Sequence, residues 1–176
     1  MIKTNPLSVL RIKKVADEIR KSYSIPLDTF FPIYEYINEL CDNNVLNLQI
    51  LEDDDVAFSD GKIAFYNPSD NFIYIKDSVD AELNEGVYRS NFTLAHELFH
   101  YMQAQVLNFK FEEVSEVKSF MDPEWQANEF AAQLLIPEEY VDLPAEELVD
   151  KFHVSIEAAL TRKVKKQKRS KKWLNG

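Results

Sequence analysis

Two histidines and a glutamate within five residues form the part of the sequence best suited to catalysis. Residues 96–100 are His-Glu-Leu-Phe-His, and they lie in a segment, Ser90 to Val106, whose apolar periodicity predicts a helix. The i, i+4 spacing places His96 and His100 on one helix face, where two imidazole nitrogens can bind one zinc ion at about 2.0–2.1 Å. Glu97 lies about 100° around the helix from His96, which directs it toward a water on the metal. The pattern predicts a metal-assisted hydrolase with Glu97 as general base.

A catalytic zinc site needs a third protein ligand and an open fourth position. The segment that starts at Asp122 has a capping aspartate, a proline in the first helical position and acid in the first turn, so it predicts a second helix. Glu124 shares a face of this helix with Ala127 and Ala131, whose small side chains allow another helix to approach closely. Glu129 points to nearly the opposite side. We therefore expect Glu124 to be the third ligand and Glu129 to be a solvated residue.

Four other features are assigned supporting roles. We expect Asn128 to hydrogen-bond a metal ligand rather than to coordinate the ion. Tyr101 is a candidate donor to an oxyanion, although packing of its ring is the favoured interpretation. The strand predicted at Phe72 to Lys76 is a hypothetical edge on which an extended substrate peptide adds as a further strand. The third histidine, His153, falls in a predicted turn and is expected to be structural or exposed.

The two helical motifs together resemble a known family. HELFH followed by EWQANEFAAQLLIP is similar to the ImmA/IrrE metallopeptidases, whose HEXXH helix is followed by a Glu-x-x-Ala-type helix ending in Leu-Leu-Met-Pro or a close variant. It is also similar to the wider gluzincin pattern. The resemblance implies that His96, His100 and Glu124 hold the metal and that Glu97 is the catalytic base. Zinc is the expected cofactor, and the same imidazole and carboxylate ligands also accept manganese or another divalent ion.

The resemblance also implies a substrate class. It is sharp over residues 91–137, with two departures, Phe99 for a small residue and Ile136 for the usual methionine, which affect substrate fit more than metal binding. Members of the family often cleave helix-turn-helix repressors that control genes of phages, mobile elements or stress responses. The leading hypothesis is thus a cytoplasmic zinc endopeptidase acting on one or a few protein partners.

Two alternatives from other functional classes stay open. In the first, the C-terminal helices and their basic tail bind DNA or dock onto a repressor, as a secondary or sole activity. In the second, a regulatory or toxin-like protein keeps the metal fold without proteolysis.

The elements that must position these residues predict an α+β fold. A small three-stranded sheet, taken as antiparallel because its connections are short, packs with the HEXXH helix and a mostly helical C-terminal part. The strands are expected at residues 45–51, 62–66 and 72–76. Helices are expected at residues 8–23, 33–41, 90–106, 123–136, 145–152 and 155–166. We expect one domain over residues 1–176, with N-terminal helices at 1–44, the sheet at 45–76, active-site helices at 90–137 and C-terminal helices with the basic tail at 144–176.

Charge is distributed unevenly along the chain. The net charge is −10, all 30 acidic residues lie at or before Glu157, and eight of the 20 basic residues lie from Arg162 to Lys172. The acidic body argues against a protein that coats DNA, and the tail is expected to be a solvated helix end rather than a nucleic-acid arm. Cys41 is the single cysteine, which fits a reducing compartment. No apolar run is long enough to cross a membrane.

Overall fold

The computed structural model describes the backbone of residues 1–174 and the side chains through Ser170. Its α-helices are α1 (Val9–Ser22), α2 (Ile33–Asp42), α3 (Asp77–Asn84), α4 (Arg89–Tyr101), α5 (Pro123–Leu135), α6 (Ala145–Phe152) and α7 (Ile156–Leu174). Its strands are β1 (Ile2–Lys3), β2 (Asn47–Leu51), β3 (Ala64–Asn67), β4 (Phe72–Lys76) and β5 (Glu112–Glu113). Short 3-10 helices lie at Val56–Phe58, Ser119–Met121 and Glu138–Tyr140, and a π-helix, Met102–Val106, continues α4. The expected α+β class is confirmed.

The three-stranded sheet is mixed, so the expectation of an antiparallel sheet is wrong. Its order is β2-β4-β3, with β3 antiparallel to β4 and β2 parallel to β4. The short turn between β3 and β4 makes a hairpin, but the segment between β2 and β3 is longer and includes a 3-10 helix, which allows the chain to cross to the other side of β4. Because β4 is paired on both edges, the hypothesis of substrate addition at Phe72–Lys76 is wrong as well. A separate two-stranded sheet, β1 with β5, was not expected.

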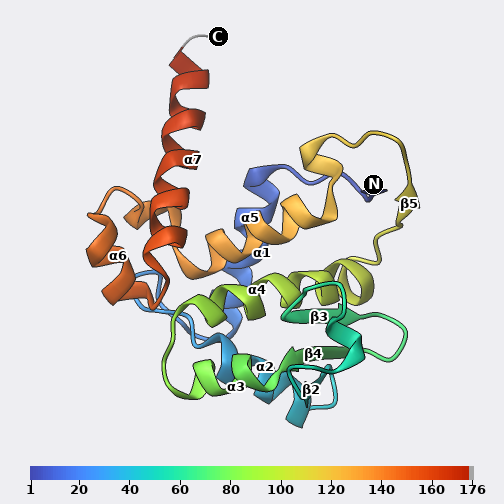
Figure 1. Ribbon diagram of the computed structural model, residues 1–176. Helices are drawn as coiled ribbons and strands as arrows, with labels where there is room; N and C mark the ends of the chain where they lie inside the picture. Colours follow the sequence, from blue (N-terminus) through green and yellow to red (C-terminus); the bar gives the residue numbers. More distant parts are fainter. Residues whose placement is uncertain (175–176) are drawn as a thin grey trace.

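The HEXXH helix, α4, lies at the centre of the molecule. It packs against α5 on one side and contacts β3 and α2 on another, while α1 packs against α5, and Figure 1 shows α4 running between α5 and the sheet. Ala127 and Ala131 of α5 are fully buried, as a close helix approach requires. The ring of Phe99 stacks on that of Phe130 with their centroids 4.6 Å apart. A bulky residue at position 99 thus fills the contact between the two helices.

Helix α3 follows directly from β4 and was not predicted. Its first turn carries Asp77 and Asp80, which favour a helix N-terminus, and the hydroxyl of Tyr34 donates to the Asp80 carboxylate. Val79 is its one fully buried hydrophobic residue. A single buried residue gives almost no periodic signal, so the sequence pattern did not indicate this helix.

The corner between α6 and α7 is fixed to the start of α4 by His153. This residue has a left-handed backbone conformation, with φ 52°, and its ring stacks between those of Phe30 and Tyr88, at centroid distances of 4.1 and 4.6 Å. The Asn91 side chain donates to its backbone carbonyl at 2.9 Å. His153 is therefore structural, as the sequence suggested.

Glu129 is fully buried, and the expectation that it is solvated is wrong. Its carboxylate lies 2.7 Å from Arg169 and 3.6 Å from Arg162, and it accepts a hydrogen bond from Gln133 at 2.8 Å. Arg162 is also fully buried and pairs with Glu138 at 2.7 Å. We call these five residues the Glu129 cluster; it joins α5 to α7 through the interior.

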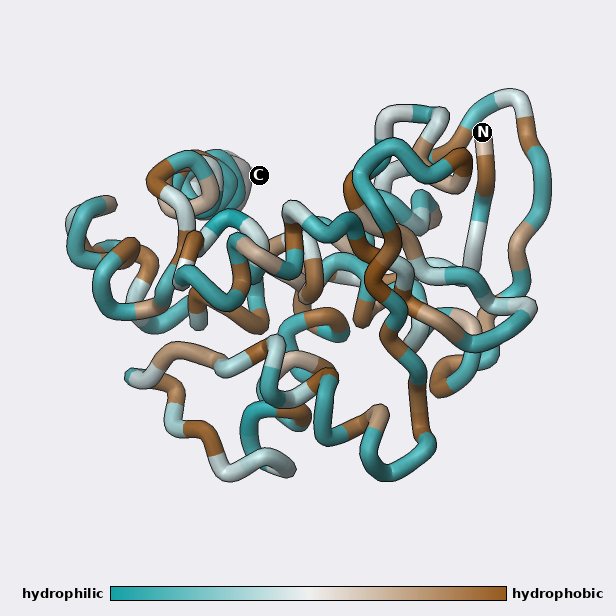
Figure 2. The backbone as a smooth tube through the Cα atoms, turned by 60° about the horizontal axis from the view of Figure 1, so that its bottom comes forward, coloured by the Kyte–Doolittle hydropathy of each residue, from teal (hydrophilic) through white to brown (hydrophobic). Residues whose placement is uncertain are grey.

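The basic tail also departs from expectation. Figure 1 shows the last turns of α7 projecting beyond the body, and in Figure 2 this helix is mostly hydrophilic. However, Lys163 donates to the carbonyl of Val141 at 3.0 Å and Lys166 pairs with Asp142 at 2.8 Å, so through Ser170 the tail is partly packed rather than a free, solvated end. The side chains of residues 171–174 and the terminal residues 175–176, which were assigned to the same segment, lie outside the described part. Among the helices that the structure describes, none is both long and apolar enough to cross a bilayer.

Candidate metal centre

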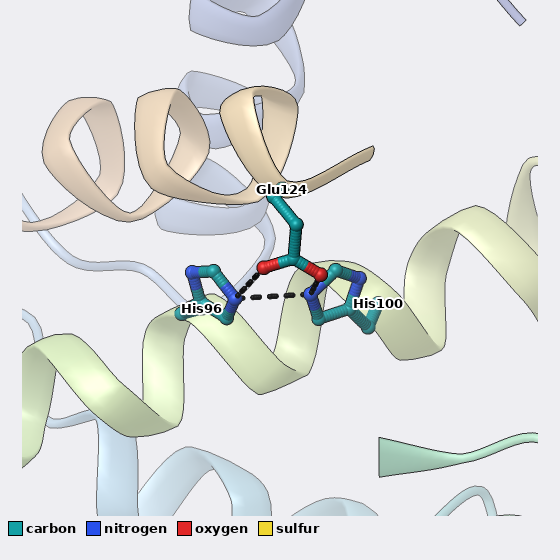
Figure 3. A group of neighbouring side chains, drawn as sticks. All are labelled: His96, His100 and Glu124. Atoms are coloured by element: carbon teal, nitrogen blue, oxygen red, sulfur yellow. Dashed lines mark hydrogen bonds and ion pairs between the residues drawn. The ribbon is translucent and has the colours of Figure 1, made fainter. Parts of the chain in front are cut away.

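Three side chains from α4 and α5 converge in a cleft between these helices and β3. His96 and His100 project from the same face of α4, and their Nε2 atoms lie 3.0 Å apart. Glu124, at the start of α5, points between the two rings, with one carboxylate oxygen 3.2 Å from His96 Nε2 and the other 3.4 Å from His100 Nε2 (Figure 3). The Asp122 side chain caps α5 by accepting from the Glu124 backbone N–H at 3.0 Å. The cap and the proline that follows it therefore set where α5 begins and where Glu124 points.

The spacing of these donor atoms suits a tetrahedral metal ion. With bonds of about 2.05 Å, two ligands of tetrahedral zinc are about 3.3 Å apart. The Nε2 atoms of His96 and His100 are 3.0 Å apart, and they lie 3.2 and 3.4 Å from one oxygen each of the Glu124 carboxylate, so each of these contacts is close to that value. All three ligand atoms also lie within 4.8 Å of one another. Two imidazoles and one carboxylate are a donor set that zinc accepts, so the residues present fit the ion.

The contacts among the three groups shift the pKa values of His100 and Glu124. Burial disfavours the charged form of His100, but the hydrogen bond to Glu124 and the charges of Glu97 and Glu124 outweigh it and raise the pKa of His100. Hydrogen bonds from His100 and His96 hold the pKa of Glu124 far below its ordinary range. Glu124 is thus charged at neutral pH, and a metal ion competes with a proton for His100 at any pH below the raised pKa of that residue.

We therefore expect zinc affinity to fall as the pH is lowered through the raised pKa of His100. Below that pKa each bound ion must displace one proton, so the affinity should drop about tenfold per pH unit. Competition with a chromophoric chelator between about pH 5 and pH 8 measures this. Glu124→Gln removes a proposed ligand and also the carboxylate that raises the pKa of His100. We therefore expect this variant to bind zinc more weakly, and its zinc affinity to begin falling at a lower pH than that of the wild type. An affinity that stays flat across the interval would contradict the expectation.

Glu97 is held beside the ligands by the edge of the sheet. Its side chain is buried, and Oε2 accepts from the backbone N–H of Tyr66 in β3 at 2.8 Å. In the β3–β4 ladder the backbone groups of Tyr66 point away from β4, which makes this N–H available. One carboxylate oxygen is thereby oriented, and Glu97 lines the same cleft as the three candidate ligands.

Each candidate histidine ligand has an amide at its other ring nitrogen. Asn128 Oδ1 lies 3.3 Å from His96 Nδ1, where the sequence analysis expected a supporting hydrogen bond. Gln103 Oε1 lies 3.0 Å from His100 Nδ1. Gln103 was not predicted from the sequence; its only local signal was the i, i+3 spacing from His100, which places both on one helix face. Tyr101 packs in the core against Tyr66, with ring centroids 5.8 Å apart, and does not line the cleft, in keeping with a packing role.

The cleft in front of the three ligands has a volume of about 340 Å³. Strand β3 contributes one wall through Ala64, Phe65 and Tyr66, and Phe111 contributes from the loop after the π-helix. A larger hollow of about 430 Å³ touches Asn128 but none of the three ligands. The three candidate ligands therefore face the smaller cleft, whose wall includes the edge strand β3.

Comparisons with known proteins found one matching family and a similar fold. The family described as IrrE N-terminal-like domain, a peptidase family, matches residues 54–163. A solved structure of a Mycobacterium tuberculosis transcriptional regulator has a similar fold, with a TM-score of 0.54 and 15% identity. The similarity covers 86% of this chain and 54% of the regulator, so the chain spans about half of that protein's length. No curated protein matches the sequence.

Proposed function

The chain belongs to the IrrE N-terminal-like peptidase family, and from this premise we propose that it is a zinc-dependent endopeptidase that cuts a specific protein partner. The observation that carries the proposal is the convergence of His96, His100 and Glu124 at separations of 3.0 to 3.4 Å. These three residues are the proposed metal ligands, and Glu97 is the proposed general base.

The residues around the cleft have different proposed roles in peptide hydrolysis. A divalent ion held at the three ligands would supply Lewis acidity and lower the pKa of a water in the cleft. Glu97 takes the proton from that water and passes it to the leaving amine. Because the Tyr66 N–H holds one oxygen of its carboxylate, the other is free to receive the proton.

Strand β3 is the proposed docking edge for the substrate. It is an edge strand, it lines the cleft, and the backbone groups of Ala64 and the carbonyl of Tyr66 face away from β4, while the Tyr66 N–H is bonded to Glu97. An extended peptide that adds to this edge gains backbone hydrogen bonds and lies across the ligands. The proposed partner is a helix-turn-helix repressor, a choice that rests on the resemblance of the two helical motifs to ImmA/IrrE peptidases.

A metal-removal experiment tests the proposal. The purified protein is analysed for bound metal and incubated with the product of a neighbouring repressor gene, before and after treatment with a chelator. We expect about one zinc per chain, cleavage of the repressor, loss of cleavage after chelation and its return when zinc is added back. Restoration with manganese instead would identify a different ion at the same ligands. Cleavage that persists in a protein stripped of metal would contradict the proposal.

The two alternatives receive less support from the contacts of the chain. Arg162 and Arg169 pair with buried Glu129 and Lys166 pairs with Asp142, which leaves fewer cations of the tail for DNA phosphates. The intact set of ligands with an adjacent carboxylate favours turnover over a metal fold without proteolysis.

A further inference from the structure

Gln103 is fully buried and contacts a proposed metal ligand, yet the proposed reaction does not use it. Its Oε1 lies 3.0 Å from His100 Nδ1. Its Nε2 lies 2.9 Å from the side-chain oxygen of Gln126 and 3.3 Å from the backbone carbonyl of Pro123. Every polar atom of this amide therefore has a partner inside the protein.

Gln126 extends the same chain of hydrogen bonds. It is also fully buried, and its Nε2 donates to the backbone carbonyls of Asn5 at 2.8 Å and Phe120 at 2.9 Å. Its Oε1 accepts from Gln103. The two glutamines thus form a relay from the N-terminal segment of the chain to His100.

The direction of this relay is fixed by the backbone. A carbonyl oxygen only accepts hydrogen bonds, so the end of Gln126 that faces Asn5 and Phe120 must be its NH2 group, and its other end must be oxygen. That oxygen and the Pro123 carbonyl require the NH2 group of Gln103 to face them. The oxygen of Gln103 then faces His100, and only a protonated Nδ1 can donate to it.

We propose that Gln103 and Gln126 are positioning residues that keep the proton of neutral His100 on Nδ1, so that its Nε2 lone pair faces the metal. The proposal rests on the proposed function, because it assigns a purpose to the orientation of one ligand. The opposite tautomer carries its proton on Nε2 and cannot bind a metal through that atom. A hydrogen bond to the outer nitrogen also fixes the plane of the ring.

At the end away from His100, the relay reaches Asn5, which also contacts the segment that forms one wall of the cleft. The side chain of Asn5 accepts from the backbone N–H of Lys110 at 2.9 Å, next to Phe111, which lines the cleft. The carbonyl of the same Asn5 accepts from Gln126. The N-terminal segment therefore supports both the wall of the cleft at Phe111 and the Nδ1-protonated tautomer of His100.

Substitution of Gln103 tests the relay. Gln103→Met removes the acceptor for the Nδ1 proton, and we expect zinc affinity to fall by roughly 10- to 100-fold, the effect usual for outer partners of metal ligands. Gln103→Glu keeps an acceptor toward Nδ1 but places a carboxylate oxygen against the oxygens of Gln126 and Pro123, so it should recover only part of the lost affinity. In ¹⁵N NMR spectra of the metal-free protein, recorded above the pKa of His100, the wild type should show a protonated Nδ1. The Met variant should shift part of His100 to the other tautomer.

Gln133→Met is the matched control, since Gln133 is a buried glutamine of α5 whose partners are Glu129 and Arg162. It should cost stability without changing zinc affinity. If Gln103→Met does not fold, Gln126→Met should lower the affinity less, in the same direction. A folded Gln103→Met variant with wild-type affinity and an unchanged tautomer would overturn the relay and leave the peptidase proposal intact. A wild type that holds no zinc but keeps the Nδ1 proton would contradict the peptidase proposal and leave the relay standing.

Discussion

Glu97→Gln should lower kcat for cleavage of the partner by about 10²- to 10⁴-fold, the range expected when a general base is removed. The amide oxygen can still accept from the Tyr66 N–H, so the side chain should keep its place. Because Glu97 is not among the three proposed ligands, the variant should bind zinc as the wild type does. Single-turnover cleavage of the repressor, with metal content measured on the same sample, checks both parts.

The control for this prediction is Glu18→Gln, a change of the same chemistry at an exposed position of α1. It should leave both zinc content and turnover unchanged. Turnover by the Glu97 variant within tenfold of the wild type would show that another group acts as the base.

Glu129→Leu should lower the free energy of unfolding by about 3–5 kcal/mol, because it removes one partner of a buried ionic network. Arg162 would keep its pair with Glu138 but lose the Glu129 carboxylate, and Arg169 would lose its partner at 2.7 Å. Urea denaturation of the metal-free protein measures the change. Since Glu129 does not line the cleft, the fraction that remains folded should bind zinc normally.

Asp142→Asn provides the comparison for an exposed pair. Asp142 is mostly exposed and pairs with Lys166 at 2.8 Å, so its loss should lower the free energy of unfolding far less than Glu129→Leu does. The double variant Glu129→Leu, Arg162→Met should regain part of the stability lost in the single variant, because the buried cation is removed with its partner. Equal effects of the Glu129 and Asp142 substitutions would show that the interior cluster contributes no more than a surface pair.

The placement of the candidate ligands was predictable because it depends on local geometry. The i, i+4 spacing of His96 and His100 sets their common face, and the cap at Asp122 sets the start of the helix that carries Glu124. Glu124 and Glu129 lie on different faces of that helix, which distinguished the ligand from its neighbour. The burial of Glu129 and its charged partners could not be predicted, because Arg162 and Arg169 come from a helix far along the chain. Their i, i+7 spacing, which puts them on one face of α7, was the one available signal.

The fold class was predictable from the sequence, but the order and direction of the strands in the sheet were not. The alternation in residues 45–51, 62–66 and 72–76 indicated three strands, but alternation does not specify strand order. The parallel pairing of β2 with β4 depends on how the intervening segment crosses the sheet. Gln103 was missed for a similar reason: its partners Pro123 and Gln126 belong to another helix, and a single glutamine in a helix forms no pattern.

The contact between Glu129 and Arg169 also bears on how fragments of this protein should be prepared. A recombinant piece ending soon after Arg162 would still contain every candidate catalytic residue, yet it would lack the guanidinium that lies 2.7 Å from a buried carboxylate. Poor yield or aggregation of such a piece would then reflect an unbalanced interior charge rather than the absence of a DNA-binding arm. Shortened versions intended for enzymology should therefore extend at least through Ser170.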